Sequence, residues 1–188
     1  MADELEIKFK LDGPVELRQR LGAAGGVCRG TVVEHNQLFD FPDGRLRAER
    51  AGLRVRVASH AAGGPPSSVV LTFKRPLTAA ADLKRMEELE TQVADAQSLA
   101  AILEGLGLQP VIAYEKRRET WLLADCKVEL DELPQLGWFV EIEGELESQI
   151  RWACNELGLS GATVRETYPA LVAHNGRPDS KGLVSLCF

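Results

Sequence analysis

Charged and apolar residues alternate along several segments of the chain, and this pattern constrains the fold more than any other feature. In ELEIKFK (residues 4–10), the charged residues occupy the even positions and the apolar residues the odd ones. Because successive side chains of a β-strand point to opposite faces, each such segment segregates charge on one face and apolar side chains on the other. The same alternation marks LRVRVA (53–58), VVLTFKRP (69–76) and EELETQV (87–93). Three further strands are expected at YEKRRETWLLA (114–124), KVELDEL (127–133) and WFVEIEGEL (138–146).

Within these segments, residues of like charge stand two positions apart. The pairs are Glu4/Glu6, Arg54/Arg56, Glu88/Glu90, Lys116/Arg118, Glu129/Asp131 and Glu141/Glu143, and Lys8, Lys10 and Lys74 add single positive charges. Such neighbours lie about 6.5–7 Å apart and repel unless an opposite charge lies between them. A sheet curled with its charged face inward would form a polar tunnel, and about eight strands leave room for one small ligand. The alternative is an open antiparallel sheet whose charged face lies in water.

Helical segments alternate with groups of strands. We expect helices from Pro14 to near Gly25, after Asp95, over residues 146–157 and over residues 167–176. In the second of these, Leu99, Ile102, Leu103 and Leu106 are expected to form one apolar stripe. The order predicts an α+β fold with one large antiparallel sheet and helices packed outside it. Residues 1–176 are expected to form a single domain, and residues 177–188 a C-terminal tail.

Composition excludes several classes of function. The net charge of -6 argues against broad nucleic-acid binding, because basic surface supplies most of that affinity. No apolar run approaches the roughly 20 residues of a membrane helix, and no secretory signal precedes the first strand, so we expect a cytoplasmic protein. The four cysteines and three histidines are scattered, which gives little support to a zinc site or a catalytic triad.

The two kinds of charge on the strands suit two kinds of ligand. Carboxylates bind hard divalent cations such as Mg²⁺ or Mn²⁺ through oxygen, whereas arginine and lysine bind phosphate oxygens. A metal-bound polyphosphate is the substrate that needs both kinds of group.

The N-terminal motif resembles the signature of a known family. Glu4-x-Glu6-x-Lys8 is similar to the ExExK motif of the CYTH, or triphosphate tunnel metalloenzyme, superfamily. Further motifs follow in that family's order: NQLFDFPDGRL, LRVR, TFKRP, EELE, EKRR, VELDEL, FVEIEG and ETYPALV. The resemblance runs from Glu4 to about Val172 and implies an eight-stranded antiparallel β-barrel. Two positions depart from the family pattern, because Met86 replaces a usual arginine and Leu38 a usual tyrosine.

The resemblance also implies roles for individual residues. It makes Glu4, Glu6 and Lys8 catalytic. The phosphate-binding residues would be Lys8, Arg54, Arg56, Lys74, Lys116 and Arg118. The metal-binding residues would be Glu4, Glu6, Glu88, Glu90, Asp131, Glu141 and Glu143. Glu129 either points into the tunnel or lies in solvent, and of the two we expect solvent.

The expected activity is hydrolysis of a small triphosphate, inorganic triphosphate first and thiamine triphosphate second, with Mg²⁺ or Mn²⁺ as cofactor. One alternative is a class IV adenylyl cyclase that converts ATP to cyclic AMP and pyrophosphate. Another is a module that binds nucleotides or polyphosphate without turning them over. We expect a monomer or homodimer that binds neither nucleic acid nor membrane.

Overall fold

The computed structural model describes residues 2–60, 66–79 and 84–188. Within these ranges, residues 2–4, 66, 78–79 and 84–85 are described by their backbone alone. Glu4 belongs to this group, so the structure gives its position in a strand and leaves its side chain outside the described residues.

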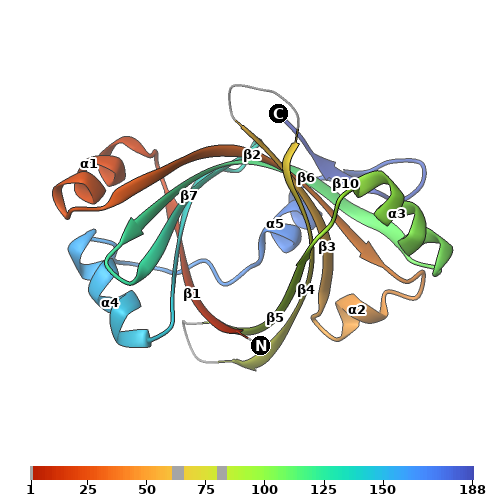
Figure 1. Cartoon of the computed structure of the whole chain (residues 1–188), viewed down its shortest axis with the longest axis horizontal. Coiled ribbons are helices and arrows are strands. Elements are labelled where there is room, and N and C mark those ends of the chain that lie inside the picture. The colour runs from red at the N-terminus through yellow and green to blue at the C-terminus, as the bar shows by residue number, and fades with distance from the viewer. Residues whose placement is uncertain (1, 61–65, 80–83) are drawn as a thin grey trace.

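Eight strands form a closed ring, seen end-on in Figure 1. They are β1 (Ala2–Leu11), β2 (Val27–Asp40), β3 (Gly52–His60), β4 (Pro66–Ala79), β5 (Lys84–Gln92), β6 (Gln109–Leu123), β7 (Cys126–Leu133) and β8 (Gly137–Gly144). The order is β2-β3-β4-β5-β1-β8-β7-β6, and β6 pairs back onto β2 to close the ring. All neighbours in the ring are antiparallel. The predicted α+β class and eight-stranded antiparallel barrel are confirmed.

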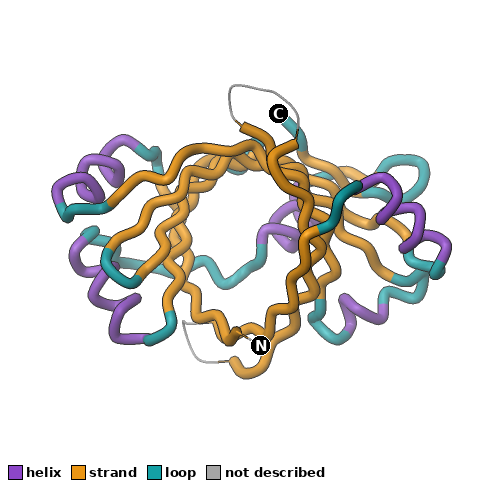
Figure 2. The backbone as a smooth tube through the Cα atoms, viewed as in Figure 1, coloured by secondary structure: helices purple, strands orange, loops and turns teal. Residues whose placement is uncertain are grey.

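The largest apolar cluster among the described residues lies outside the ring, between the strands and the helices. On β7, Val128 and Leu130 are fully buried in an apolar cluster, while Glu129 and Asp131 between them point into the ring. Residues of α1 (Val15–Ala23) and α4 (Glu147–Glu156) complete that cluster. Figure 2 shows both helices on the outer surface of the strands. The alternation of the sequence therefore directs apolar side chains outward and charged side chains inward.

A second apolar cluster lies under α3 (Ala96–Gly105), near the short helix α2 (Arg45–Ala48). Asp95 caps α3 as predicted, because its carboxylate accepts a 2.7 Å hydrogen bond from the Ser98 backbone N–H. The predicted stripe is wrong in part. Leu103 is buried, but Ile102 and Leu106 are 60% and 67% exposed. These two residues form a neighbouring row on the helix surface that turns away from β3.

The C-terminal segment packs against the end of the barrel. After α5 (Tyr168–Asn175), the chain forms β9 (Arg177–Pro178) and β10 (Val184–Leu186). β10 pairs in parallel with residues 112–114 of β6. The pairing exists because β7 covers only residues 117–123 of the longer β6, which leaves the first half of that edge available. None of the helices in the described ranges has both the length and the apolar character needed to cross a membrane.

Candidate active site

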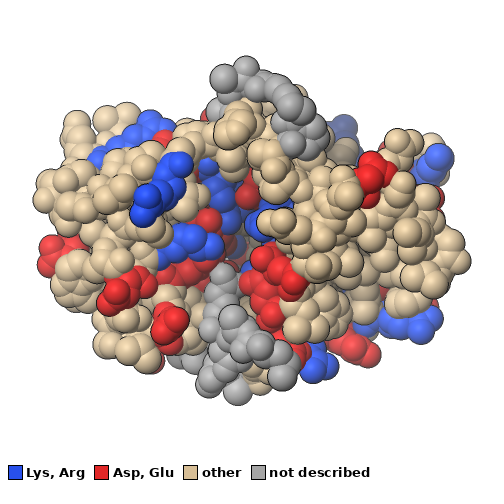
Figure 3. Space-filling view, in the orientation of Figure 1, with Lys and Arg blue, Asp and Glu red and all other residues tan. Residues whose placement is uncertain are grey.

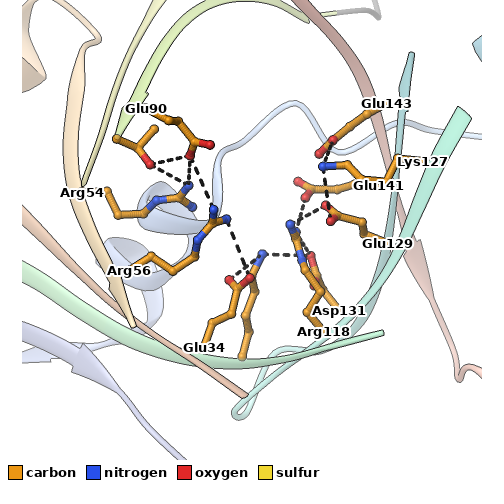
Figure 4. A network of polar contacts seen from close by, with 12 residues as sticks. Glu34, Arg54, Arg56, Glu90, Arg118, Lys127, Glu129, Asp131, Glu141 and Glu143 are labelled. Atoms are coloured by element: carbon orange, nitrogen blue, oxygen red, sulfur yellow. Dashed lines mark hydrogen bonds and ion pairs between the residues drawn. The ribbon is translucent and has the colours of Figure 1, made fainter. Parts of the chain in front are cut away.

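The interior of the barrel gathers the charged residues of the strands. Figure 3 shows the molecule hollowed at the centre of the ring, with basic and acidic side chains along the hollow. The close view in Figure 4 separates them into two groups that face each other. The acidic wall consists of Glu129 and Asp131 on β7 and Glu141 and Glu143 on β8. The arginine wall consists of Arg54 and Arg56 on β3, with Glu90 on β5.

Arg118, on β6, holds the acidic wall together. Its Nε donates to Asp131 Oδ1 at 2.7 Å, and its Nη2 donates to Glu141 Oε2 at 2.8 Å. A further ion pair joins it to Glu129. Four carboxylates on two adjacent strands repel one another, and the buried guanidinium offsets this repulsion through hydrogen bonds to charged oxygens.

Three carboxylates of this wall form a candidate metal site, which we call the carboxylate cluster. Glu129, Glu141 and Glu143 each present one oxygen, and the three oxygens lie within 4.8 Å of one another. An all-oxygen donor set of this kind fits a hard divalent cation such as Mg²⁺ or Mn²⁺. Glu6 of β1 pairs in register with Glu143, so it belongs to the adjoining strand at the same level of the barrel.

The carboxylates of the cluster differ in their affinity for protons. Burial raises the pKa of Glu129 to about 7, despite the adjacent Arg118, and the neighbouring Glu143 adds to the rise. Burial also acts on Glu141, but Lys8 and Arg118 beside it hold its pKa well below the usual range. The Lys8 Nζ lies 3.0 Å from Glu141 Oε1. Glu129 therefore holds a proton more readily than Glu141 does.

The arginine wall is held by longer contacts. Glu90 Oε1 lies 3.9 Å from Arg54 Nη2 and 3.5 Å from Arg56 Nη2. The Thr72 hydroxyl donates to the same oxygen at 2.7 Å. A guanidinium carries five N–H donors, so these loosely held arginines can bind phosphate oxygens as well. Lys74 of β4 extends this wall and pairs with Glu88 at 2.8 Å.

Glu34 and Lys116 connect the two walls. Lys116 Nζ lies 3.4 Å from Glu34 Oε2 and 3.3 Å from Asp131 Oδ2, and Arg56 Nη1 lies 3.8 Å from Glu34 Oε1. Burial favours the neutral form of Glu34, but Lys116, Arg118 and Arg56 together hold its pKa well below the usual range. The interior is thus one continuous network of opposite charges (Figure 4).

Tyr168, the first residue of α5, supports two of the lysines from one end of the barrel. Lys8 Nζ lies 3.8 Å from the centre of its ring and Lys116 Nζ lies 4.9 Å from it. Lys8 also donates to the Glu166 carbonyl at 3.0 Å. These contacts fix the two ammonium groups by cation–π attraction and a hydrogen bond.

The structure brings most of the predicted site residues into this network. They are Lys8, Arg54, Arg56, Lys74, Glu88, Glu90, Lys116, Arg118, Asp131, Glu141 and Glu143. Glu6 follows the same inward alternation on β1, and the side chain of Glu4 is outside the described residues. All five acidic residues that are brought into the network contact basic residues, and Glu141 and Glu143 also belong to the carboxylate cluster.

Four residues of the interior are missing from the prediction. Glu129 was expected in solvent, but only 3% of it is exposed, so this expectation is wrong. Glu34, Asn36 and Lys127 were given no role. Asn36 is buried, and its side-chain oxygen and nitrogen have no hydrogen-bond partner among the described residues. A signal was available, because Glu34 and Asn36 alternate on β2 and Lys127, Glu129 and Asp131 alternate on β7.

A closed antiparallel barrel with an acidic wall and an arginine wall facing each other across its interior defines a distinct class of fold. A model of the CYTH domain family matches residues 2–168. The chain therefore belongs to the CYTH family.

Individual relatives carry related names. An adenylate cyclase, CyaB, of Aeromonas hydrophila is 27% identical over 170 residues, which is 85% of this chain and 82% of the relative. A candidate adenylate cyclase of Methanocaldococcus jannaschii is 26% identical over 140 residues, 74% of this chain and 75% of the relative.

Solved structures share the fold. That of a candidate adenylate cyclase of Vibrio parahaemolyticus superposes with a TM-score of 0.78 at 17% identity, over 92% of this chain and 98% of the other. A candidate adenylyl cyclase of Hippeastrum, described as having a dominant triphosphatase activity, superposes with a TM-score of 0.69 at 18% identity, over 91% and 95% of the two chains.

Proposed function

We propose that the protein hydrolyses a small triphosphate, inorganic triphosphate or thiamine triphosphate, with the help of Mg²⁺ or Mn²⁺. The observation that carries this proposal is the opposition of an acidic wall and an arginine wall across one enclosed interior. A triphosphate needs cationic groups along its oxygens and a metal that neutralises the charge developing at the reacting phosphoryl group. The triphosphatase activity described for the Hippeastrum protein, which has the same fold, is consistent with this reaction.

Basic residues from several strands would hold the phosphate chain. They are Lys8, Arg54, Arg56, Lys74, Lys116 and Arg118. The metal would be held by Glu129, Glu141 and Glu143, with Glu4 and Glu6 on the neighbouring strand. When bound, the metal supplies Lewis-acid polarisation of the phosphoryl oxygens. Asp131, Glu88 and Glu90 would complete the acidic set and keep the basic side chains oriented toward the substrate.

A second candidate function is an adenylyl cyclase, which the names of the two curated relatives favour. The same walls would bind the triphosphate of ATP, and the ribose 3′-hydroxyl would replace water as the nucleophile. The two reactions differ in their products, because hydrolysis of triphosphate gives orthophosphate and pyrophosphate, whereas cyclisation gives cyclic AMP and pyrophosphate.

The test is a comparison of substrates. The protein is incubated separately with tripolyphosphate, thiamine triphosphate and ATP, each with Mg²⁺ or Mn²⁺, and the products are separated by chromatography. We expect orthophosphate to be released from one of the first two, and Glu6→Gln to abolish its release. Cyclic AMP as the main product would overturn hydrolysis in favour of the cyclase. Tight binding of tripolyphosphate without any product would identify a binding module.

The arginine wall provides a further test of the same proposal. Arg56→Ala should raise KM and lower kcat, with a loss of about 10- to 100-fold in kcat/KM, because a charge-assisted contact to phosphate is removed. Arg117→Ala is the matched control, since Arg117 lies on the outer face of β6 and is paired with Glu132. The control should retain wild-type kinetics. Unchanged kinetics in Arg56→Ala would remove this residue from the site.

A further inference from the structure

Lys127 lies against the carboxylate cluster. This residue is near the start of β7, and its Nζ forms an ion pair with Glu143 and lies 3.5 Å from Glu129 Oε1. Figure 4 shows its ammonium group between these two carboxylates. Both belong to the three residues whose oxygens are spaced for a cation. A positive charge of the protein itself thus lies where a bound cation would be attracted.

Lys127 is held differently from the other basic residues that contact the cluster in the described part of the chain. The Lys8 and Arg118 side chains are only 1% and 8% exposed, and Lys8 is fixed further by Tyr168 and Arg118 by Asp131. The Lys127 side chain is 42% exposed. Its flexible four-carbon stem can move the ammonium group into water, where solvation replaces the ion pairs.

We propose that Lys127 is a built-in counter-cation that takes the place of the metal in the metal-free protein and is displaced when a divalent cation binds. The inference rests on the metal role that the proposed function gives to the cluster. A divalent cation bound by these carboxylates repels the nearby ammonium groups, and Lys127 is the one among the described basic residues at the cluster whose side chain is exposed enough to move into water. Lys127 would stabilise the empty cluster against repulsion among its carboxylates, and it would lower the affinity for the metal by competing for them.

The first experiment measures metal binding without substrate. Mn²⁺ is titrated calorimetrically into metal-free wild-type protein and into Lys127→Met, which keeps the length of the side chain and removes its charge. We expect about tenfold tighter binding in the variant. Equal or weaker binding in Lys127→Met would overturn the inference.

Lys116→Met is the matched control. It removes the same charge from the interior, but Lys116 contacts Glu34 and Asp131 and not the cluster. Its affinity for Mn²⁺ should rise less than about threefold, as expected for a more distant charge. An increase as large as that of Lys127→Met would show a general effect of charge and would also overturn displacement.

The second experiment uses the wild-type protein and does not depend on the folding of a variant. An amine-specific acetylating reagent is applied with and without Mn²⁺, and the modification of Lys127 is followed by peptide mass spectrometry. Displacement predicts faster acetylation of Lys127 in the presence of Mn²⁺. Lys181, in the exposed C-terminal segment, should react at the same rate in both samples. Unchanged or slower acetylation of Lys127 with metal would contradict the inference.

Both experiments separate this inference from the proposed function. If Lys127→Met binds Mn²⁺ more tightly but the wild-type protein releases no product from any triphosphate, the displacement of Lys127 is supported and the proposed hydrolysis is refuted. If the protein turns over triphosphate while Lys127 remains at the carboxylate cluster, the proposed hydrolysis is supported and the displacement of Lys127 is refuted.

Discussion

At the scale of single residues, the interior of the barrel is stabilised by ion pairs and hydrogen bonds between buried charged side chains. Asp131 has no exposed surface, and its two oxygens accept hydrogen bonds from Arg118 and contact Lys116. Removing the Asp131 charge leaves Arg118 and Lys116 with fewer counter-charges while both stay buried. The acidic residue therefore matters for folding as much as for binding.

We predict that Asp131→Asn lowers the free energy of unfolding by about 3–5 kcal/mol, because Arg118 and Lys116 lose their shared counter-charge while they stay buried. Urea denaturation of the metal-free protein measures the change. Glu132→Gln provides the control on the next residue of β7. Its ion pair with Arg117 lies on the outer surface, with the Arg117 side chain 47% exposed, and should cost less than about 1 kcal/mol. Equal losses in the two variants would contradict the special role of Asp131.

At the scale of elements, strict alternation made the strands predictable. The side chains at residues 54, 56, 118, 129, 131, 141 and 143 all derive their inward direction from a period of two, which is a local property. The side chain of Lys116, which contacts Glu34 and Asp131, follows the same period. The pairing of β10 with β6 could not be read in this way. This pairing is possible because β6 is longer than β7, which leaves part of the edge of β6 uncovered. The ends of the two strands are set by their pairing in the folded protein and not by the sequence of either strand alone. The direction of Glu129 was predictable from this period, because it alternates with Asp131 on β7, but the pairing with Arg118 of β6 that compensates its buried charge was not.

The C-terminal element offers a test of how the end of the barrel is held. Leu186 of β10 is buried in one apolar cluster with Tyr168 and Val172 of α5. Leu186→Ala should lower the free energy of unfolding by about 2–5 kcal/mol through the lost apolar contacts and the cavity that remains. It should also reduce the binding of tripolyphosphate, because Tyr168 supports Lys8 and Lys116. Urea denaturation and calorimetry measure the two effects.

Leu106→Ala is the control for Leu186→Ala. It makes the same substitution at the end of α3, at a residue that is 67% exposed. Its effect on stability should stay within about 0.5 kcal/mol. If Leu186→Ala were as mild as Leu106→Ala, the segment after α5 would be a passive tail, as the sequence alone suggests.

At the scale of the whole molecule, the barrel encloses opposite charges, while its largest apolar cluster lies outside the ring. Stability of such a fold depends on the ionisation of the enclosed carboxylates. Glu34 is the clearest case. Burial raises its pKa and four neighbouring basic residues lower it, and the effect of the basic residues is the larger one. Since its pKa is lowered in the folded state, the folded protein binds fewer protons than the unfolded chain in acid. The stabilisation from Glu34 is therefore complete above the ordinary glutamate value of 4.5 and is lost as the pH falls below it.

Glu34→Gln keeps the shape of the side chain and removes this charge, so it isolates the contribution of one carboxylate to the pH profile. In chelator-containing buffer at pH 7, the variant should be less stable than the wild type by about 2–3 kcal/mol. This difference in the free energy of unfolding should decrease by about 1.4 kcal/mol for each pH unit below 4.5. The reason is that protonation removes the Glu34 charge from the wild type, whereas the variant has no charge at this position. Glu104→Gln, on the exposed surface of α3, should follow the wild type throughout. A gap that stays constant between pH 7 and pH 3.5 would show that Glu34 acts through its shape and not through its charge.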